Sequence, residues 1–260
     1  MDLHLRGKRA LITGASKGIG AAVAEALAEE GCNLHLAARN SAAMEALAAR
    51  LSAAHGIDIA VHSADLREAG ALSRLAAAAA DSDILVNNAG DVPSGSLDTI
   101  DEATWRRAWD LKVYGYINLA RLIYAQMKGR GDGVIVNIIG AAGERFEANY
   151  IVGSAGNAAL MAFTRALGGT SLKDGIRVVG INPGPVATDR IKALTRRRAL
   201  AQFGDEARVD DVLRRFPRGR PAHPREIADS VAFLASDRSG YTSGVIVTID
   251  GGICAGGGGG

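Results

Sequence analysis

The chain has 260 residues, of which 48% are hydrophobic, and it carries a formal net charge of +2 at pH 7. A chain of this length and composition can bury one large core, so we expect a single α/β domain over residues 1–255. The small net charge argues against a general polyanion-binding protein. No apolar run is long enough to span a bilayer, and we expect no membrane partner. Residues 256–260 are all glycine, and we expect them to form a flexible tail.

The cysteine content indicates a reducing environment. Two cysteines occur, Cys32 and Cys254, and they lie far apart without the spacing of a metal site. Disulfide frameworks are typical of small secreted domains that are rich in cysteine. The first residues, 1–4, also lack the features of a signal peptide. We therefore expect a cytoplasmic protein with no metal site.

Strands and helices are predicted to alternate along the whole chain. Short apolar runs predict strands, and apolar residues three or four positions apart predict helices. The predicted strands span residues 9–12, 33–38, 57–62, 84–86, 134–139, 177–181 and 245–249. The predicted helices start near residue 19, include Met44, Leu47 and Leu51, and then cover about 66–80, 102–127, 150–172, 189–215 and 224–236. This alternation predicts a doubly wound parallel sheet with helices on both faces.

A glycine-rich segment joins the first predicted strand to the first predicted helix. It reads Thr13-Gly14-Ala15-Ser16-Lys17-Gly18-Ile19-Gly20. At such a turn, backbone N–H groups and the positive end of the helix dipole can bind a pyrophosphate, and glycines leave room for its close approach. An ordinary glycine turn is the alternative, but the strand–turn–helix context favours a nucleotide site.

From this segment onward the sequence resembles the short-chain dehydrogenase/reductase family. Residues 13–20 match the family's TGxxxGxG motif, and residues 87–90 (NNAG) match the motif after its fourth strand. Residues 182–188 (NPGPVAT) match the segment that touches the nicotinamide, and residues 219–252 match the C-terminal pattern. The resemblance covers almost the whole chain and implies a Rossmann fold that binds a nicotinamide dinucleotide.

The resemblance also implies which residues bind this cofactor. They are Thr13, Gly14, Ser16, Lys17, Gly18, Ile19, Gly20, Arg39, Asn40, Asp65, Leu66, Asn88, Ala89, Gly90, Pro183, Gly184, Val186 and Thr188. Asp65 stands where the family contacts adenine.

The residues after the second predicted strand favour NADP(H) over NAD(H). An acidic residue there would bind the ribose 2′-hydroxyl and repel a 2′-phosphate. This chain instead has Arg39, followed by Asn40, and Lys17 supplies a second cation from the glycine-rich segment. Both cations could be solvated surface charges, but their shared position favours NADP(H) as the cofactor.

The family's catalytic Asn, Ser, Tyr and Lys do not align with the same residue types here. An ungapped alignment anchored on residues 158–165 places Gly153 at the Tyr position and Asn157 at the Lys position of the family's YxxxK motif. It places Gly140 at the Ser position and Lys112 at the Asn position. The alignment therefore predicts an atypical active site.

Tyr150 is not a direct equivalent of the family's Tyr. Aligning the two would leave Ser154 at the Lys position and insert three residues in a helix, which would turn later side chains by about 60°. Gly153 and Gly156 instead indicate a need for space, because glycine costs about 1 kcal/mol in a helix interior relative to alanine. Tyr150 could lean into the space at Gly153, or it could be a packing tyrosine at a helix start.

The expected proton donor of this atypical site is Lys112, with Tyr150 or a water molecule as the alternatives. It continues the helix face of Trp105, Trp109 and Tyr116 and is expected to point inward. A partly desolvated lysine has a lowered pKa and can act as an acid or a base, although it could also extend along the aromatic surface to solvent. The candidate catalytic residues are Lys112, Tyr150 and Asn157.

A basic segment follows Thr188, where the resemblance implies a substrate lid over about residues 188–222. Residues 190–220 contain ten Arg and Lys against four Asp and Glu. Such a patch would attract a carboxylate- or phosphate-bearing substrate, while a solvated face or a subunit contact is equally open. Without interleaved aromatic residues or a recognition motif, we expect no nucleic acid partner.

Three functions remain open from the sequence. The first is an NADP(H)-dependent oxidoreductase acting on a carbonyl or alcohol through a non-standard proton relay. The second is a redox-neutral lyase or hydratase that retains NADP, and the third is a non-catalytic NADP-binding protein. Retention of residues 183–188 favours the first two, and loss of the four catalytic positions favours the last two. We predict the first on the strength of the resemblance.

The resemblance further implies a homotetramer or homodimer. The long helices predicted over residues 102–127 and 150–172 would pair across a symmetric interface. Their apolar residues Leu119, Ile123 and Met161, together with Phe163, are expected to fill it.

Overall fold

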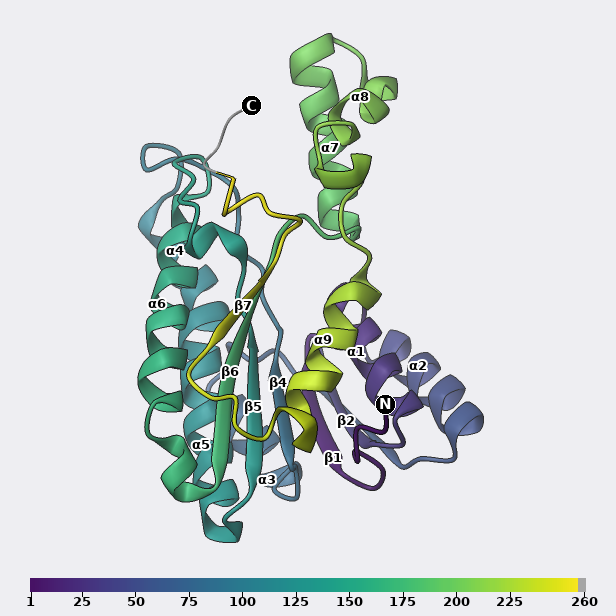
Figure 1. The fold of residues 1–260 in the computed structure, drawn as a ribbon. Helices are drawn as coiled ribbons and strands as arrows, with labels where there is room; N and C mark the ends of the chain where they lie inside the picture. Colours follow the sequence, from purple (N-terminus) through teal and green to yellow (C-terminus); the bar gives the residue numbers. More distant parts are fainter. Residues whose placement is uncertain (257–260) are drawn as a thin grey trace.

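Seven parallel strands form the central sheet of the computed structural model, which describes residues 1–256 (Figure 1). The strands are β1 (Arg9–Thr13), β2 (Asn33–Ala38), β3 (Ile59–Ser63), β4 (Ile84–Asn87), β5 (Gly133–Ile138), β6 (Ile176–Pro183) and β7 (Ile246–Ile249). They lie in the order β3-β2-β1-β4-β5-β6-β7, and every neighbouring pair is parallel. This is the doubly wound Rossmann order, with its switch point between β1 and β4. The predicted fold class is confirmed.

Helices cover both faces of the sheet. They are α1 (Gly18–Glu29), α2 (Ser41–His55), α3 (Ala71–Ala78), α4 (Glu102–Trp109), α5 (Gly115–Arg130), α6 (Ile151–Gly168), α7 (Asp189–Phe203), α8 (Val209–Leu213) and α9 (Pro224–Ala235). Figure 1 shows α1, α2 and α9 on one face, and α3, α5 and α6 on the other. In β1, Ala10 and Ile12 face the first group while Leu11 faces the second, as strand alternation requires. Because both faces are buried, the strands are almost continuously apolar.

Two helix boundaries differ from those that the sequence predicts. α3 begins at Ala71 rather than near residue 66, because Gly70, in the left-handed region with φ 74°, interrupts the chain before it. The basic segment predicted as one helix over residues 189–215 is divided into α7 and α8 by Gly204, which has φ 70°. Figure 1 shows both of these helices standing above the carboxyl ends of the strands.

The helix predicted over residues 102–127 is interrupted near its middle. A π-helical turn, Asp110–Tyr114, separates α4 from α5. Such a turn accommodates one extra residue and changes the direction in which its side chains point, and it is often found at functional sites. Lys112 lies at the centre of this turn.

A buried arginine lies at the amino end of β6, at the other end of the sheet from α7 and α8. Arg177 of β6 is 6% exposed, and its guanidinium donates hydrogen bonds to Leu234 O at 2.6 Å, Ser239 Oγ at 2.9 Å, Ala235 O at 3.1 Å and Ser236 O at 2.9 Å. The carbonyl groups at the end of a helix have no partners within the helix. Arg177 therefore caps α9 and fixes it against the sheet.

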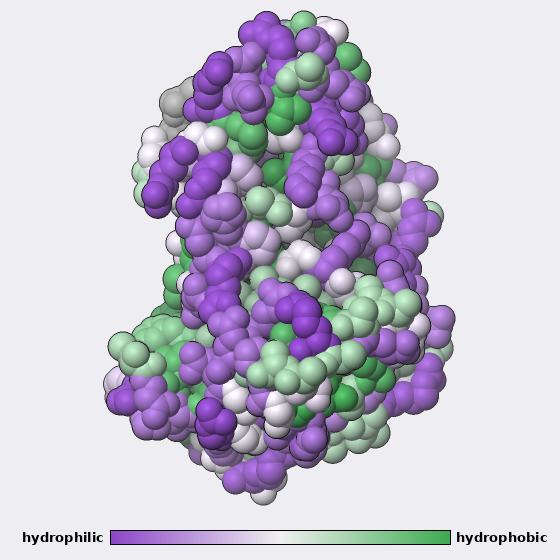
Figure 2. Space-filling model, turned by 90° about the vertical axis from the view of Figure 1, so that its right-hand side faces the viewer, coloured by the Kyte–Doolittle hydropathy of each residue, from purple (hydrophilic) through white to green (hydrophobic). Residues whose placement is uncertain are grey.

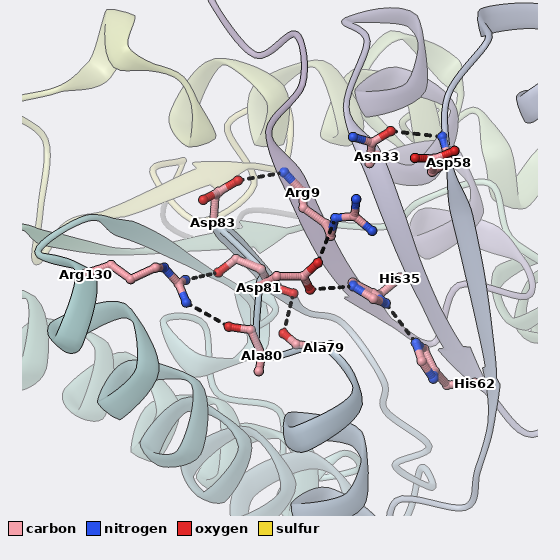
Figure 3. Close-up of polar contacts among 11 residues, drawn as sticks. Arg9, Asn33, His35, Asp58, His62, Ala79, Ala80, Asp81, Asp83 and Arg130 are labelled. Carbon is pink, nitrogen blue, oxygen red and sulfur yellow. Dashed lines mark hydrogen bonds and ion pairs between the residues drawn. The ribbon is translucent and has the colours of Figure 1, made fainter.

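A polar cluster joins the first three strands to the loop before β4 (Figure 3). His35 Nδ1 lies 2.9 Å from His62 Nε2, and His35 Nε2 lies 2.9 Å from Asp81 Oδ1. Arg9 Nε lies 3.0 Å from the second Asp81 oxygen. Burial, together with the neighbouring His35, lowers the pKa of His62. The cluster thus holds its outer histidine in the neutral form near neutral pH.

The residues expected to fill a subunit interface lie mostly inside the chain's own core. Leu119, Ile123 and Met161 are 1%, 0% and 5% exposed and pack against the sheet or between α5 and α6. The expectation is therefore wrong for these three, whereas Phe163 is half-buried. Within residues 1–256, no helix is long and apolar enough to cross a membrane. Of the expected glycine tail, only Gly256 belongs to this described part of the chain.

Candidate active site

A cavity of about 2450 Å³ opens at the carboxyl ends of the strands, beneath α7 and α8. Figure 2 shows it as a hollow between the upper part of the molecule, which contains α7 and α8, and the part below, which contains the sheet. The position agrees with the rule that ligands of doubly wound sheets bind at the switch point beyond the carboxyl ends of the strands. All of the predicted catalytic and cofactor-binding residues line this cavity except Thr13 and Gly20.

The glycine-rich segment leads directly into α1. Gly14 and Gly18 have φ of 68° and 61°, which favour glycine. A Cβ added at Gly20 would clash with the Gly14 carbonyl oxygen and lie 2.6 Å from Asn88 Nδ2. Among the described residues, no side chain caps the N-terminus of α1, so its first N–H groups remain available. The loop and the helix dipole therefore fit a pyrophosphate.

Thr13 and Asn88 tie this loop to the chain after β4. Thr13 Oγ1 accepts hydrogen bonds from Asn88 N at 2.9 Å and Ala89 N at 3.0 Å. Asn88 Nδ2 donates to Thr13 O at 2.9 Å. Thr13 is 1% exposed. Its side chain thus shapes the loop from behind, while Asn88 and Ala89 line the cavity.

Two of the predicted cofactor-binding residues that line the cavity are cations, and one is a carboxylate. Arg39 follows β2, and Lys17 lies in the glycine-rich segment. Lys17 Nζ lies 3.9 Å from Asp189 Oδ2, with both side chains more than three-quarters exposed, and such a pair contributes little. Asp65 accepts hydrogen bonds from Arg67, whose guanidinium lowers the pKa of Asp65 to about 2. The Asp65 carboxylate is therefore ionised. Arg39 and Lys17 are both exposed and line the cavity, so both can contact a ligand there.

Residues 183–188 and the start of the lid bound another side of the cavity. Ala187 N donates to Ala222 O, and Ala222 N donates to Pro185 O, both at 2.8 Å. These bonds hold the two ends of the segment 188–222 side by side. The segment between them carries α7 and α8 over the cavity.

Lys112 is buried beside the cavity without a carboxylate partner. It is 8% exposed, and its Nζ donates to Ile138 O at 2.7 Å and to the Tyr116 hydroxyl at 2.9 Å. Burial, with a smaller contribution from the charge of Arg190, lowers the pKa of Lys112 to about 7. Lys112 therefore exchanges a proton near neutral pH. Its partner Tyr116, four residues further along the chain, was not a sequence candidate for the site, although residues at that spacing are neighbours on a helix.

The ring of Tyr150 occupies the space beside Gly153. A Cβ at Gly153 would clash with two carbon atoms of this ring and lie 2.6 Å from its hydroxyl oxygen. Of the two readings that the sequence leaves open, the structure thus favours a Tyr150 that leans into this volume. The guanidinium carbon of Arg190 lies 5.0 Å from the ring centre. Tyr150 is therefore placed between α6 and the lid.

Asn157 makes a similar approach to Gly140. A Cβ at Gly140 would lie 2.7 Å from Asn157 Nδ2, and Gly140 has φ 140°, which strongly disfavours other residues. Asn157 is 4% exposed and lines the cavity. Two polar side chains, Tyr150 and Asn157, thus reach the positions at which Gly153 and Gly140 lack side chains.

Two further residues support this arrangement and were not sequence candidates. Ser154 Oγ accepts a hydrogen bond from Glu147 N at 3.0 Å, which holds the loop before Tyr150. Trp109 Nε1 donates to Val152 O at 3.1 Å. Trp109 and Val152 are 43 residues apart in the sequence, so no local pattern indicates their contact.

A family model described as enoyl-(acyl carrier protein) reductase matches residues 14–254. The match includes the glycine-rich segment, the NNAG motif and the C-terminal pattern. The chain belongs to the short-chain dehydrogenase/reductase family.

Members of this family resemble the chain over nearly its whole length. The 2-keto-3-deoxy-L-fuconate dehydrogenase of Xanthomonas campestris pv. campestris is 35% identical over 253 residues, which cover 96% of this chain and 81% of that protein. The structure of L-sorbose reductase from Gluconobacter frateurii with NADPH and L-sorbose has a TM-score of 0.91 and 30% identity, covering 98% of this chain and 99% of that one. A 7α-hydroxysteroid dehydrogenase solved with NADH has a TM-score of 0.85 and 30% identity, covering 96% of each chain. An oxidoreductase of this family, with a nicotinamide cofactor, is thus supported.

Proposed function

We propose that the protein is an NADP(H)-dependent oxidoreductase that interconverts a carbonyl and an alcohol, with Lys112 as the proton donor. The observation that carries this proposal is the position of Lys112, which borders the cavity and whose burial lowers its pKa to about 7. A general acid acts best when its pKa lies near the working pH. Lys112 meets this condition without the Tyr–Lys pair that the family usually employs.

The neighbouring residues support a reorganised site. By the ungapped alignment, Gly140 and Gly153 replace the Ser and Tyr of the family. Asn157 reaches towards Gly140, and the Tyr150 ring fills the space at Gly153. A site that had merely lost its function would not need polar side chains at both places.

The proposed chemistry assigns one task to each residue. When bound, the nicotinamide supplies a hydride to the carbonyl carbon or accepts it from the alcohol. In reduction, charged Lys112 stabilises the negative charge that develops on the substrate oxygen and then donates its Nζ proton to it, leaving a neutral amine. In oxidation, neutral Lys112 takes that proton. Ile138 O and Tyr116 hold the ammonium in place, while Tyr150 and Asn157 orient the substrate oxygen.

We further propose that the cavity-lining members of the predicted cofactor set hold NADP(H), with Thr13 and Gly20 shaping the loop. Lys17 and Arg39 would pair with the 2′-phosphate. Hydrogen bonds between charged groups contribute about 1.5–3 kcal/mol, so NADPH should bind at least about tenfold more tightly than NADH. Arg39→Asp should invert this preference in calorimetry at fixed salt. Equal affinities in the unaltered protein would contradict the assignment.

The lid and the assembly remain proposals of the same kind. Residues 188–222 would close over a substrate, and the excess of Arg and Lys in them favours a carboxylate- or phosphate-bearing one. Helices α5 and α6 would form a homodimer or homotetramer through their exposed faces. A sedimentation run at micromolar concentration that shows a single 27-kDa species would contradict the assembly.

The experiment that tests the function is single-turnover oxidation of NADPH with a panel of aldehydes and ketones. We expect hydride transfer to at least one carbonyl class, with a rate that falls as the pH rises above about 7. Tight NADPH binding with no turnover, in either direction, would instead favour the redox-neutral or the non-catalytic alternative. These alternatives stay open because the ungapped alignment predicts that all four catalytic positions of the family are replaced.

A further inference from the structure

One face of α7 points into the cavity. Arg190, Leu194 and Arg198 all line it, and their spacing of four residues places them on one side of the helix. Arg190 lies in the first turn of α7, directly after the segment 183–188. The cavity-facing cation at the base of the lid is thus Arg190, while Arg198 lies about 12 Å further along the helix axis.

Arg190 is not neutralised within the protein. Of the acidic residues on the lid, Asp211 pairs with Arg208 and Arg214, and Asp189 faces Lys17. Within residues 1–256, no carboxylate forms an ion pair with Arg190 at 4.0 Å or less. Glu147 also lines the cavity, and it too forms no ion pair with Arg190. A guanidinium without an internal partner at a ligand cavity is available to an anion.

The contact with Tyr150 positions this cation without consuming its hydrogen-bond donors. The guanidinium carbon lies 5.0 Å from the ring centre. Stacking on a ring occupies the face of a guanidinium and leaves the N–H groups at its edge free. These groups match the two oxygens of a carboxylate. The Tyr150 ring therefore positions the Arg190 guanidinium at the cavity while its N–H groups stay free for a ligand.

We propose that Arg190 binds a carboxylate of the substrate, so that the substrates are oxo acids and the corresponding hydroxy acids. This inference rests on the proposed oxidoreductase function. Lys112, Tyr150 and Arg190 surround one part of the cavity with two cations, and a substrate that carries its own negative charge there balances them. A carboxylate can pair with one guanidinium edge in two hydrogen bonds.

The bound carboxylate would also act on Lys112. The positive charge of Arg190 lowers the pKa of Lys112, and pairing with an anion offsets that charge. An acid substrate thus favours the charged lysine, the form that donates a proton. For reduction of an oxo acid, the pH at which kcat falls should therefore lie above the pH at which kcat/KM falls, because kcat reports the substrate complex.

The test compares 2-oxobutanoate with its methyl ester in the unaltered protein and in two variants. Arg190→Gln should lower kcat/KM for the acid by about 10- to 100-fold, as expected for a lost charge-assisted pair, while the ester changes less than about threefold. Arg197→Gln is the matched control, because Arg197 is an exposed α7 residue outside the cavity lining and its loss changes the net charge equally. Arg190→Lys should recover part of the acid activity. NADPH affinity, measured by calorimetry, reports whether each variant is folded.

A binding measurement separates this inference from the proposed function. Oxamate, which cannot be reduced, should bind the NADPH-loaded protein and lose its affinity in Arg190→Gln. If oxamate binds in this way but no carbonyl is reduced, the anion site stands and the oxidoreductase proposal fails. If carbonyls are reduced with equal acid and ester losses in Arg190→Gln, or with equal losses in both variants, the inference is overturned and the oxidoreductase proposal stands.

Discussion

Lys112 and Arg177 are both cations with less than a tenth of their surface exposed, yet the protein holds them in opposite ways. Arg177 donates four hydrogen bonds to the end of α9 and the turn that follows it. The negative end of a helix dipole stabilises a cation there. Lys112 donates two hydrogen bonds, to Ile138 O and the Tyr116 hydroxyl, and it borders the cavity.

The difference separates a cation that holds the fold together from one that we propose to be reactive. An ammonium has three donors, and Lys112 uses two of them in hydrogen bonds to other described residues; we propose that the third meets the substrate oxygen. Its burial is not balanced by a carboxylate, and its pKa is lowered to about 7. Arg177 keeps its charge because a guanidinium does not lose its proton in proteins. Burial alone therefore does not indicate function; incomplete partnering beside a cavity does.

Replacing Lys112 should have the largest effect on chemistry. General acid catalysis typically contributes 10²–10⁴-fold, so we expect Lys112→Met to lower single-turnover NADPH oxidation on that scale. Stability should be unchanged or higher, because exchange of a buried charge for an apolar side chain of similar length is often neutral or stabilising. Stopped-flow kinetics and thermal unfolding measure the two effects. Undiminished single-turnover rates would remove Lys112 from the mechanism.

Replacing Arg177 should lower stability and leave cofactor binding almost unchanged, the reverse of what we expect for Lys112, whose replacement affects the reaction without lowering the stability. Arg177→Met leaves several buried carbonyl groups without a partner, each costing about 1–3 kcal/mol, and we expect a loss of about 3–5 kcal/mol in the free energy of unfolding. The Kd for NADPH should change less than twofold below the unfolding transition, because Arg177 lies outside the cavity lining. Denaturant titration and calorimetry provide the measurements. A variant of normal stability would show that the four bonds do not hold α9.

Gly153→Ala tests whether turnover depends on the position of the Tyr150 ring. Alanine is the better helix former, but its Cβ would clash with the Tyr150 ring. A displaced catalytic group can cost about 100-fold, and we expect turnover to fall by about 10- to 100-fold. Gly156→Ala is the milder control, since its Cβ would approach Val113 Cγ2 to 3.1 Å. Equal activities of both variants would argue that Tyr150 only packs.

The fold could be predicted because its signals are local. Alternating apolar runs and amphipathic periods specify the strands and helices, and glycines mark the turn into α1. The residues of the cavity lining were predicted from the resemblance to the family's motifs, and they lie together because the carboxyl ends of parallel strands lie at one edge of the sheet. Thr13 and Gly20 lie just outside the lining because motif matching does not separate residues that touch a ligand from residues that shape its loop.

The arrangement within the site could not be predicted in this way. The π-helical turn at Lys112 has no side-chain period that distinguishes it from an α-helix over five residues. Tyr150 reaches Gly153 because its backbone leaves the helical region, with φ −139° and ψ 38°. The interface expectation for Leu119 failed because an apolar helix face does not reveal whether it packs on its own sheet or on another subunit.

The pH dependence should separate Lys112 from the other group with a lowered pKa near neutrality, His62. The unfolded state binds the extra proton in both cases, so both groups make stability rise with pH. For His62 this occurs below its ordinary value of 6.5, and stability is lost on acidification. For Lys112 it occurs between about 7 and the ordinary value of 10.5. Arg177 contributes no such change in this range.

The pH dependence of stability is the smallest effect that we expect, and it distinguishes Lys112 from both His62 and Arg177. Between pH 7 and 10, stability from Lys112 should rise while the reduction rate falls, because the charged form is the proton donor. Lys112→Met should remove the rise in unfolding free energy above pH 7, measured as a difference from the unaltered protein in parallel denaturant titrations. His62→Gln should change only the acidic side, and slightly, since His62 is half-exposed. If Lys112→Met leaves the unfolding free energy with the same pH dependence on the acidic and the alkaline side, Lys112 does not titrate near neutrality. It would then not differ from Arg177 in the way proposed.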